Sequence, residues 1–208
     1  MFARGAWKWT YALPPAVVGA ALLFVSSLWG VLGFALAAFV VWFHRDPERT
    51  PAGRGAVSPA DGKVSVVRED PDGRVRVGVF MNVHDVHVNR APLDGTVEAV
   101  DHRPGGHRPA FDKESEHNER VRIDCGDHEV VLIAGAFARR IHPYVEAGDE
   151  LARGDRIGHV SFGSRADLVL PREYDRGDVL VAGGDSVTAG ETVLARRDGG
   201  DATPTGGA

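Results

Sequence analysis

Cysteine and lysine are nearly absent from this chain of 208 residues, which contains one cysteine and three lysines. The single cysteine, Cys125, excludes an internal disulfide and is typical of a small buried side chain in a reducing compartment. Almost all of the basic residues are therefore arginine, and acidic residues outnumber them, for a formal net charge of −5. A general nucleic-acid-binding protein carries an excess of positive charge, so this composition argues against a nucleic-acid partner.

Charge is missing altogether from residues 9–43. A run this long indicates a membrane segment, but one straight helix would measure about 50 Å against a hydrocarbon core of about 30 Å. Ser26, Ser27 and Gly30 lie near its middle, so we expect two short helices in a hairpin. Positive residues on both flanks favour both ends on the cytoplasmic side. The sequence therefore predicts a membrane anchor over residues 1–50 that holds the rest of the chain at the cytoplasmic face of the cell membrane.

Helical periodicity is missing beyond residue 50, where short valine-rich runs alternate with Gly, Pro and Asp turns. We expect strands over five such runs: Lys63–Arg68, Arg74–Phe80, Thr96–Asp101, Arg120–Asp124 and Glu129–Ile133. Two weak internal repeats accompany them, residues 58–64 with 91–97 and residues 145–151 with 187–193. The pattern predicts a mainly β domain over residues 51–197, a small barrel or sandwich with hairpins like those of biotinyl and lipoyl domains. A disordered tail is expected over residues 198–208.

The pair Gly163-Ser164 is a plausible place for a chain to cut itself. Glycine tolerates strained backbone conformations, so the following hydroxyl can reach the glycine carbonyl. Attack converts the peptide bond to an ester, and loss of the serine α-proton leaves a dehydroalanine that hydrolyses to a pyruvoyl group. Such a ketone forms a Schiff base with an amine and acts as an electron sink. A Gly-Ser pair is common in ordinary turns, however, so the pair alone predicts no chemistry.

Six short motifs occur in a fixed order over residues 40–195, and as a set they resemble the short form of the phosphatidylserine decarboxylase family, which includes archaetidylserine decarboxylases. The motifs are Phe43-His44-Arg45-Asp46-Pro47-Glu48-Arg49, Ser58-Pro59-Ala60-Asp61-Gly62, Asp85-Val86-His87-Val88-Asn89-Arg90-Ala91-Pro92, Asn118-Glu119-Arg120, Ala138-Arg139-Arg140-Ile141 and Phe162-Gly163-Ser164-Arg165. We read the first as a linker and assign it no chemistry.

The resemblance implies an enzyme, a carboxy-lyase made as a zymogen. Autocatalytic cleavage between Gly163 and Ser164 would leave two fragments that stay associated, with a pyruvoyl cofactor at the position of Ser164. The reaction implied is decarboxylation of a serine phospholipid, phosphatidylserine or archaetidylserine, to the ethanolamine phospholipid. The hydrophobic hairpin fits a lipid substrate. Whether the lipid tails are esters or isoprenoid ethers, and whether the chain forms a homo-oligomer, are left open.

The serine hydroxyl needs a base, and histidine is the usual base near neutral pH. The resemblance selects His87 as the catalytic-site histidine and Asp61 as its carboxylate. In a strand Asp85, His87 and Asn89 would share one face. A hairpin turn at Asp61 and a structural role for His87 are alternatives. Longer family members carry a second histidine where this chain has Arg90, so it stays open whether His87 serves both cleavage and protonation.

Substrate phosphate or carboxylate groups call for arginine, which binds them through two parallel hydrogen bonds. The sequence does not choose among five candidates, each of which could equally form a structural ion pair: Arg90, Arg120, Arg139, Arg140 and Arg165.

Three other functions remain to be weighed. A membrane-tethered zinc hydrolase is not supported, because the sequence contains no His-Glu-x-x-His motif and His84 and His87 would lie on opposite strand faces. We therefore expect no metal. A group-carrying barrel module lacks an acceptor, because no lysine follows Lys113. A pyruvoyl-dependent decarboxylase of a soluble amino acid stays open as the alternative.

Overall fold

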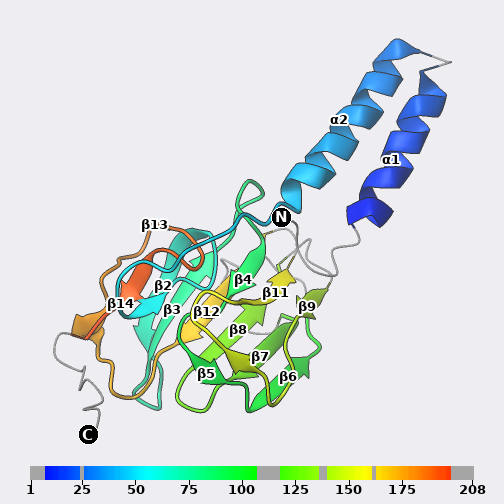
Figure 1. The fold of residues 1–208 in the computed structure, drawn as a ribbon. Helices are drawn as coiled ribbons and strands as arrows, with labels where there is room; N and C mark the ends of the chain where they lie inside the picture. The colour runs from blue at the N-terminus through cyan, green and yellow to red at the C-terminus, as the bar shows by residue number, and fades with distance from the viewer. Residues whose placement is uncertain (1–7, 24–25, 107–117, 136–139, 161–162, 198–208) are drawn as a thin grey trace, which may run out of the picture.

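The computed structural model describes residues 8–23, 26–106, 118–135, 140–160 and 163–197 of the chain. Two helices project from a β domain that contains all of the strands (Figure 1). The mainly β fold and the preceding helical hairpin are therefore confirmed. The expected tail over residues 198–208 lies outside the described residues.

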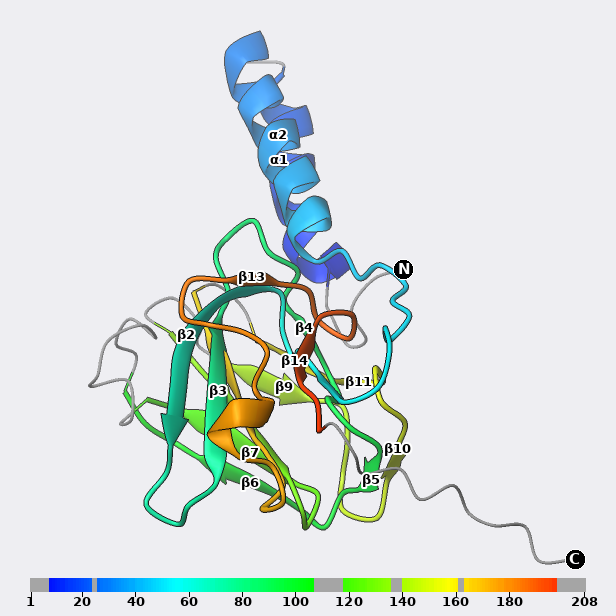
Figure 2. The same ribbon diagram turned by 90° about the vertical axis from the view of Figure 1, so that its left-hand side faces the viewer.

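The hairpin consists of α1 (Lys8–Leu22) and α2 (Ser27–Phe43), which lie side by side in both views (Figures 1 and 2). Two glycines allow this close approach, because a Cβ atom added to Gly33 would lie 2.5 Å from the Cα atom of Gly19. The split of the uncharged run into two short helices is thus confirmed. Among the described residues, neither helix is both long enough and apolar enough to cross a membrane.

The largest sheet has seven antiparallel strands in the order β13-β2-β3-β12-β8-β7-β6. Their bounds are β2 (Gly62–Glu69), β3 (Val75–Phe80), β6 (Ala99–Arg103), β7 (Arg120–Asp124), β8 (Glu129–Ile133), β12 (Arg165–Val169) and β13 (Ser186–Val187). β7 and β8 have the bounds expected from the sequence. In the part of the chain that the structure describes, β13 and β6 are unpaired edges, so the sheet does not close into a barrel.

Three smaller sheets complete the β domain. They pair β4 (Val88–Arg90) with β11 (Arg156–Val160) and β9 (Ile141–Pro143), β1 (Ala56–Val57) with β14 (Val193–Ala195), and β5 (Gly95–Thr96) with β10 (Glu150–Leu151). The run expected as one strand over residues 96–101 is therefore divided between β5 and β6, which belong to different sheets. A single 3₁₀ turn, η2 (Arg176–Asp178), is the only helix that the described residues form after residue 50.

The central strand β12 separates the hydrophobic core from a charged face. Ala166 and Leu168 are fully buried in the core. Arg165 and Asp167 alternate with them on the other face, where the Arg165 Nε atom donates to the Asp167 carboxylate at 2.8 Å. Because side chains alternate along a strand, Ser164 continues the core-facing set.

The first expected repeat, residues 58–64 with 91–97, is visible in the hydrogen bonds of the backbone. Val64 donates its N–H to the carbonyl of Asp185 at 2.9 Å, and Val97 donates to Asp149 at 2.9 Å. The pairing of β2 with β13 corresponds in register to the pairing of β5 with β10. The sequence similarity therefore reflects a structural duplication.

The second expected repeat was aligned incorrectly. The structure matches Gly148 with Gly184, which donate to Val97 and Val64 respectively, both at 2.8 Å. The correct correspondence is thus offset from the sequence alignment of residues 145–151 with 187–193. The error arises because each copy contains two short turns with glycine followed by an acidic residue, which look alike in sequence.

The segment after α2 joins the helices to the β domain through a buried carboxylate. Asp46 is 1% exposed and accepts hydrogen bonds from Arg90 at 3.0 Å and from Arg156 at 2.6 Å. The Arg90 guanidinium also donates to the Pro47 carbonyl at 2.8 Å. Asp46 therefore fixes both the linker and the ends of β4 and β11.

Replacement of Asp46 tests this join. Asp46→Asn leaves the buried Arg90 without its counter-charge, so the free energy of unfolding should fall by about 3 kcal/mol. Glu48→Gln is the matched control, because Glu48 is 73% exposed and also contacts Arg156; its loss should change stability by about 0.5 kcal/mol or less. Urea denaturation in detergent measures both, and equal effects would contradict a role for burial.

Candidate active site

Ser164 lies at the start of β12, fully buried and facing the core. Its carbonyl accepts a hydrogen bond from the Met81 N–H at 2.9 Å, which continues the pairing of β12 with β3 by one residue. The two side chains therefore lie on the same face, and the Ser164 Oγ atom is 4.0 Å from the Met81 sulfur. Sulfur is a weak acceptor, so the hydroxyl keeps its capacity to hydrogen-bond elsewhere.

Gly163, before it, has φ of +64°, a region that L-amino acids with a side chain rarely adopt. A Cβ atom added there would meet nothing within 4 Å, so glycine is required for its backbone conformation and not for lack of space. The peptide bond expected to be cut thus joins a left-handed glycine to a buried serine.

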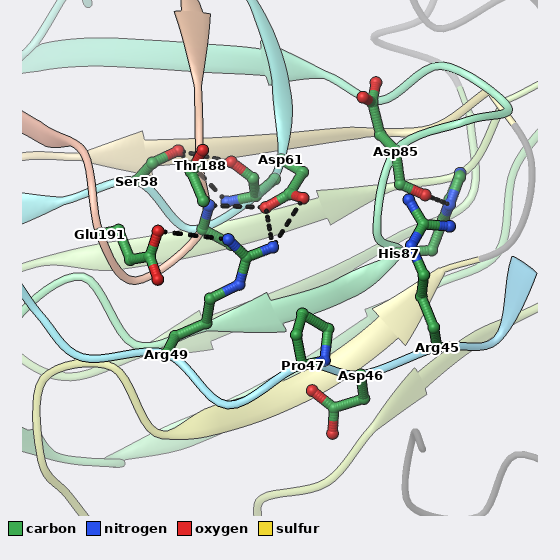
Figure 3. A network of polar contacts seen from close by, with 12 residues as sticks. Arg45, Asp46, Pro47, Arg49, Ser58, Asp61, Asp85, His87, Thr188 and Glu191 are labelled. Carbon is green, nitrogen blue, oxygen red and sulfur yellow. Dashed lines mark hydrogen bonds and ion pairs between the residues drawn. The ribbon is translucent and has the colours of Figure 1, made fainter. Parts of the chain in front are cut away.

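His87 is 4% exposed, and its ring packs against Phe43, the last residue of α2, with 4.4 Å between ring centroids. Its Nδ1 atom is 3.0 Å from the carbonyl of Asp85 (Figure 3). A carbonyl can only accept, so Nδ1 carries the proton and Nε2 is an acceptor. Among the described residues, Nε2 has no hydrogen-bond partner.

Burial lowers the pKa of His87 to about 4. The hydrogen bond and charge of Asp85 oppose this shift, whereas the positive charges of Arg45 and His44 add to it. The imidazole is therefore neutral near pH 7, with its Nε2 lone pair available to take a proton.

Asp61 faces Arg49, whose Nη2 atom donates to its carboxylate at 3.0 Å (Figure 3). The N–H of Ala189 donates to Oδ1 at 2.8 Å. Burial raises the pKa of this carboxyl above its usual range; the N–H groups of Ala189 and Val86 and the Arg49 guanidinium lower it. No hydrogen bond between Asp61 and His87 is found in the described residues. The Asp61 carboxylate interacts instead with the backbone N–H of Val86, the residue before His87.

The duplication supplies a counterpart for Asp61. In the second copy, Asp94 accepts a hydrogen bond from the N–H of Arg153 at 2.7 Å, as Asp61 does from Ala189. Part of the role of Asp61 is therefore that of a turn residue, which the sequence left open. What distinguishes it is Arg49, in the linker to which the sequence analysis assigned no chemistry.

The expectation that Asp85, His87 and Asn89 share a strand face is wrong for Asp85. The chain turns there, with the Asp85 carboxylate accepting from the Asn82 N–H at 2.6 Å, and β4 begins only at Val88. His87 and Asn89 do lie opposite Val88, which packs in a separate cluster. The bend at residues 82–85 has no apolar alternation, and sequence periodicity gave no sign of it.

The five candidate arginines are dispersed. Arg90 is buried against Asp46, as described above. Arg120 and Arg165 line a pocket on the charged face of the large sheet, opposite the face that carries Ser164. Arg140 is exposed, and Arg139 lies outside the described residues. The four arginines that the structure describes are therefore not gathered at Ser164.

A second group of histidines, which the sequence analysis did not single out, lies on the sheet beside His87. His159 on β11 stacks on His142 of β9 with 4.5 Å between ring centroids, and its Nδ1 atom is 2.8 Å from the Tyr144 hydroxyl. Burial, with the neighbouring histidines, lowers the pKa of His159 to about 3. Within the described residues, no group of three or more potential ligands is arranged to hold a metal ion.

Comparison with known proteins identifies the family. The family model described as phosphatidylserine decarboxylase matches residues 36–195. A protein of Halobacterium salinarum named "Putative archaetidylserine decarboxylase proenzyme" is 74% identical over 94% of this chain and all of its own length. Proteins of Streptomyces griseus and Streptomyces avermitilis, both named "Phosphatidylserine decarboxylase proenzyme", are 48% identical over 93% of each chain. With most of its length covered by the family model, the chain belongs to the phosphatidylserine decarboxylase family.

Proposed function

We propose that this chain is a self-processing decarboxylase that converts a serine phospholipid to the ethanolamine phospholipid. The observation that carries the proposal is Ser164, buried directly after a glycine with positive φ, in a chain whose relatives are named decarboxylase proenzymes. Those names support a lipid substrate and an enzyme of two chains after cleavage.

The cut proceeds by attack of the Ser164 hydroxyl on the carbonyl carbon of Gly163. The serine oxygen replaces the amide nitrogen on that carbon, giving an ester. Removal of the Ser164 α-proton then expels the Gly163 carboxylate, which keeps the serine oxygen. The resulting dehydroalanine takes up water and releases ammonia, leaving a pyruvoyl group at the new amino end. The burial of Ser164 favours this course, because bulk water is kept from the ester.

His87 acts as the base. Its Nε2 lone pair accepts the hydroxyl proton, and its neutral state near pH 7 keeps that lone pair available. Asp61 is a positioning residue, since its carboxylate contacts the backbone of Val86, the residue before His87. This differs from a direct carboxylate–histidine pair and gives Arg49 the task of holding Asp61 in place.

In decarboxylation the pyruvoyl group supplies an electron sink for the electron pair left when carbon dioxide departs. His87 Nε2, once it has taken up a proton released by the substrate amine, delivers that proton to the carbon that carried the carboxylate. The residues present fit such a group, because Ser164 is fully buried and the buried His87 keeps an acceptor atom, Nε2, that has no partner in the described residues.

The α1–α2 hairpin supports a location of this site at a lipid surface. Apolar side chains are exposed along both helices: Leu13, Val17, Val18, Leu23, Leu28, Trp29, Val31, Leu32, Phe34 and Leu36. Such a continuous apolar surface favours contact with acyl or isoprenoid chains. The contact of Phe43 with His87 connects the hairpin to the catalytic histidine.

Replacement of Ser164 tests the function as a whole. The purified wild-type protein should separate into residues 1–163 and 164–208 on a denaturing gel and release carbon dioxide from phosphatidylserine or archaetidylserine vesicles. Ser164→Ala should remain one chain and release none, because it has no hydroxyl to start the cut. Wild-type protein that is uncut yet active, or active on free serine alone, would contradict the proposal.

The pH dependence of processing tests His87. Self-cleavage requires the neutral imidazole, so the rate should be level from about pH 8 to pH 5 and fall to half near pH 4, where His87 becomes protonated. Processing of purified precursor, followed on gels across this range, measures it. His87→Gln should process more than tenfold more slowly at every pH. A wild-type midpoint near 6.5 would mean that the base is a solvated group.

The duplication provides a control for Asp61. Asp61→Asn should slow self-cleavage by about tenfold or more, because it loses the charge held between Arg49 and the Val86 backbone. Asp94→Asn, at the equivalent turn in the other copy, should process at the wild-type rate. Densitometry of precursor and fragments over time compares them. Similar slowing in both variants would show that Asp61 acts only in its turn.

A further inference from the structure

Two buried hydrogen-bond acceptors lie close together in the sequence, one directly before β4 and one within it. They are Nε2 of His87 and Oδ1 of Asn89, and neither has a partner in the described part of the chain. The two residues are separated by one position, so their side chains lie on the same face. The one other side-chain atom of this kind that the described residues contain belongs to His128, at the far end of β8 from Ser164.

The orientation of the Asn89 amide is fixed by its neighbours. Its Nδ2 atom is 3.3 Å from the Pro59 carbonyl, which can only accept, so the NH₂ group must face that carbonyl. The same nitrogen is 3.7 Å from the Met81 sulfur. Oδ1 of Asn89 is therefore the amide atom that has no hydrogen-bond partner. In His87 it is Nε2 that has none, because Nδ1 bonds to the carbonyl of Asp85.

Met81 places Asn89 beside the reacting serine. Its sulfur contacts both the Asn89 amide, at 3.7 Å, and the Ser164 hydroxyl, at 4.0 Å. Asn89 and Ser164 are both fully buried. The unpaired amide oxygen thus lies in the same enclosed region as the hydroxyl that the proposed function consumes.

A buried acceptor without a donor costs about 1–3 kcal/mol, and two such atoms on one face of the same segment indicate that a donor group belongs there. The Ser164 hydroxyl has one proton and disappears when the chain is cut. What remains is a pair of neutral acceptors, which suits a group with at least two N–H bonds. Carboxylate and phosphate oxygens have no proton to offer, and a trimethylated nitrogen has none either.

We propose that Asn89 Oδ1 and His87 Nε2 form a subsite for the primary amino group of the lipid head group, and that Asn89 selects substrates with N–H donors. The inference rests on the proposed function and names the part of the substrate that these atoms orient. The two acceptors take two N–H bonds of the ammonium group, so that loss of its third proton directs the nitrogen lone pair to the carbonyl carbon at position 164.

Binding to the carbonyl-reduced enzyme tests the subsite without turnover. Mature protein is treated with borohydride, which reduces the ketone to an alcohol and prevents covalent capture of amines. Glycerophosphoethanolamine and glycerophosphocholine are then compared by calorimetry. The wild type should bind the ethanolamine compound at least about tenfold more tightly, as expected for hydrogen bonds to a charged donor. Equal binding of the two would overturn the proposal.

Variants at Asn89 separate hydrogen bonding from shape. Asn89→Leu should reduce the preference for the ethanolamine compound to about threefold or less. If Asn89→Leu does not fold, Asn89→Val is used in its place, because valine is favoured in strands. Asn89→Asp keeps an acceptor and should keep the preference. His128→Gln, which alters the other unpartnered histidine, is the matched control and should bind as the wild type does. A preference that survives in the apolar variants is steric and contradicts the subsite.

The readouts keep the two proposals apart. A wild type that cuts itself and releases carbon dioxide supports the proposed function whatever the binding data show. Apolar Asn89 variants that are cut normally, yet lose the preference for the ethanolamine compound, support the subsite specifically. Normal cleavage with an unchanged preference overturns the subsite and leaves the decarboxylase function standing.

Discussion

The antiparallel register of β12 with β3 is the constraint on which the site depends. One backbone hydrogen bond, from Met81 to Ser164, fixes which residue faces the core at the point where the chain is to be cut. A slip of one residue would turn Arg165 inward and expose the hydroxyl on the charged face, because side chains alternate along a strand. β12 pairs with β3 on one side and with β8 on the other, so both neighbouring strands fix its register. The serine is therefore positioned by the sheet and not by its own loop.

Two ion pairs that are shielded from solvent join parts of the chain that are distant in sequence. Asp46 and Arg49, from the short segment after α2, reach into the β domain to contact Arg90 and Asp61 respectively. These two pairs hold the linker against the β domain.

The sequence predicted strands best where the hydrophobic pattern was uninterrupted. β7 had its expected bounds because valine and isoleucine alternate there with charged residues, and β8 because Glu129 is followed by an unbroken apolar run, whereas residues 97–98 divide β5 from β6. Ser164 and His87 could be selected through motifs alone. The Arg49–Asp61 pair could not, because its partners come from different motifs and meet only through the fold. The bend at Asp85 and the free amide oxygen of Asn89 depend on local backbone geometry that periodicity does not encode.

The duplicated turn explains how Asp61 can take on a second role without loss of the framework. Asp61 and Asp94 make the same hydrogen bond to a backbone N–H, so each turn is stable independently of any chemistry. Arg49 changes the surroundings of Asp61, whereas Asp94 keeps its structural role in the equivalent turn. Because the fold contains this turn twice, one copy can take on a new role while the other keeps its structural role. In the described residues it is Asp61, and not Asp94, that forms an ion pair with Arg49 of the linker.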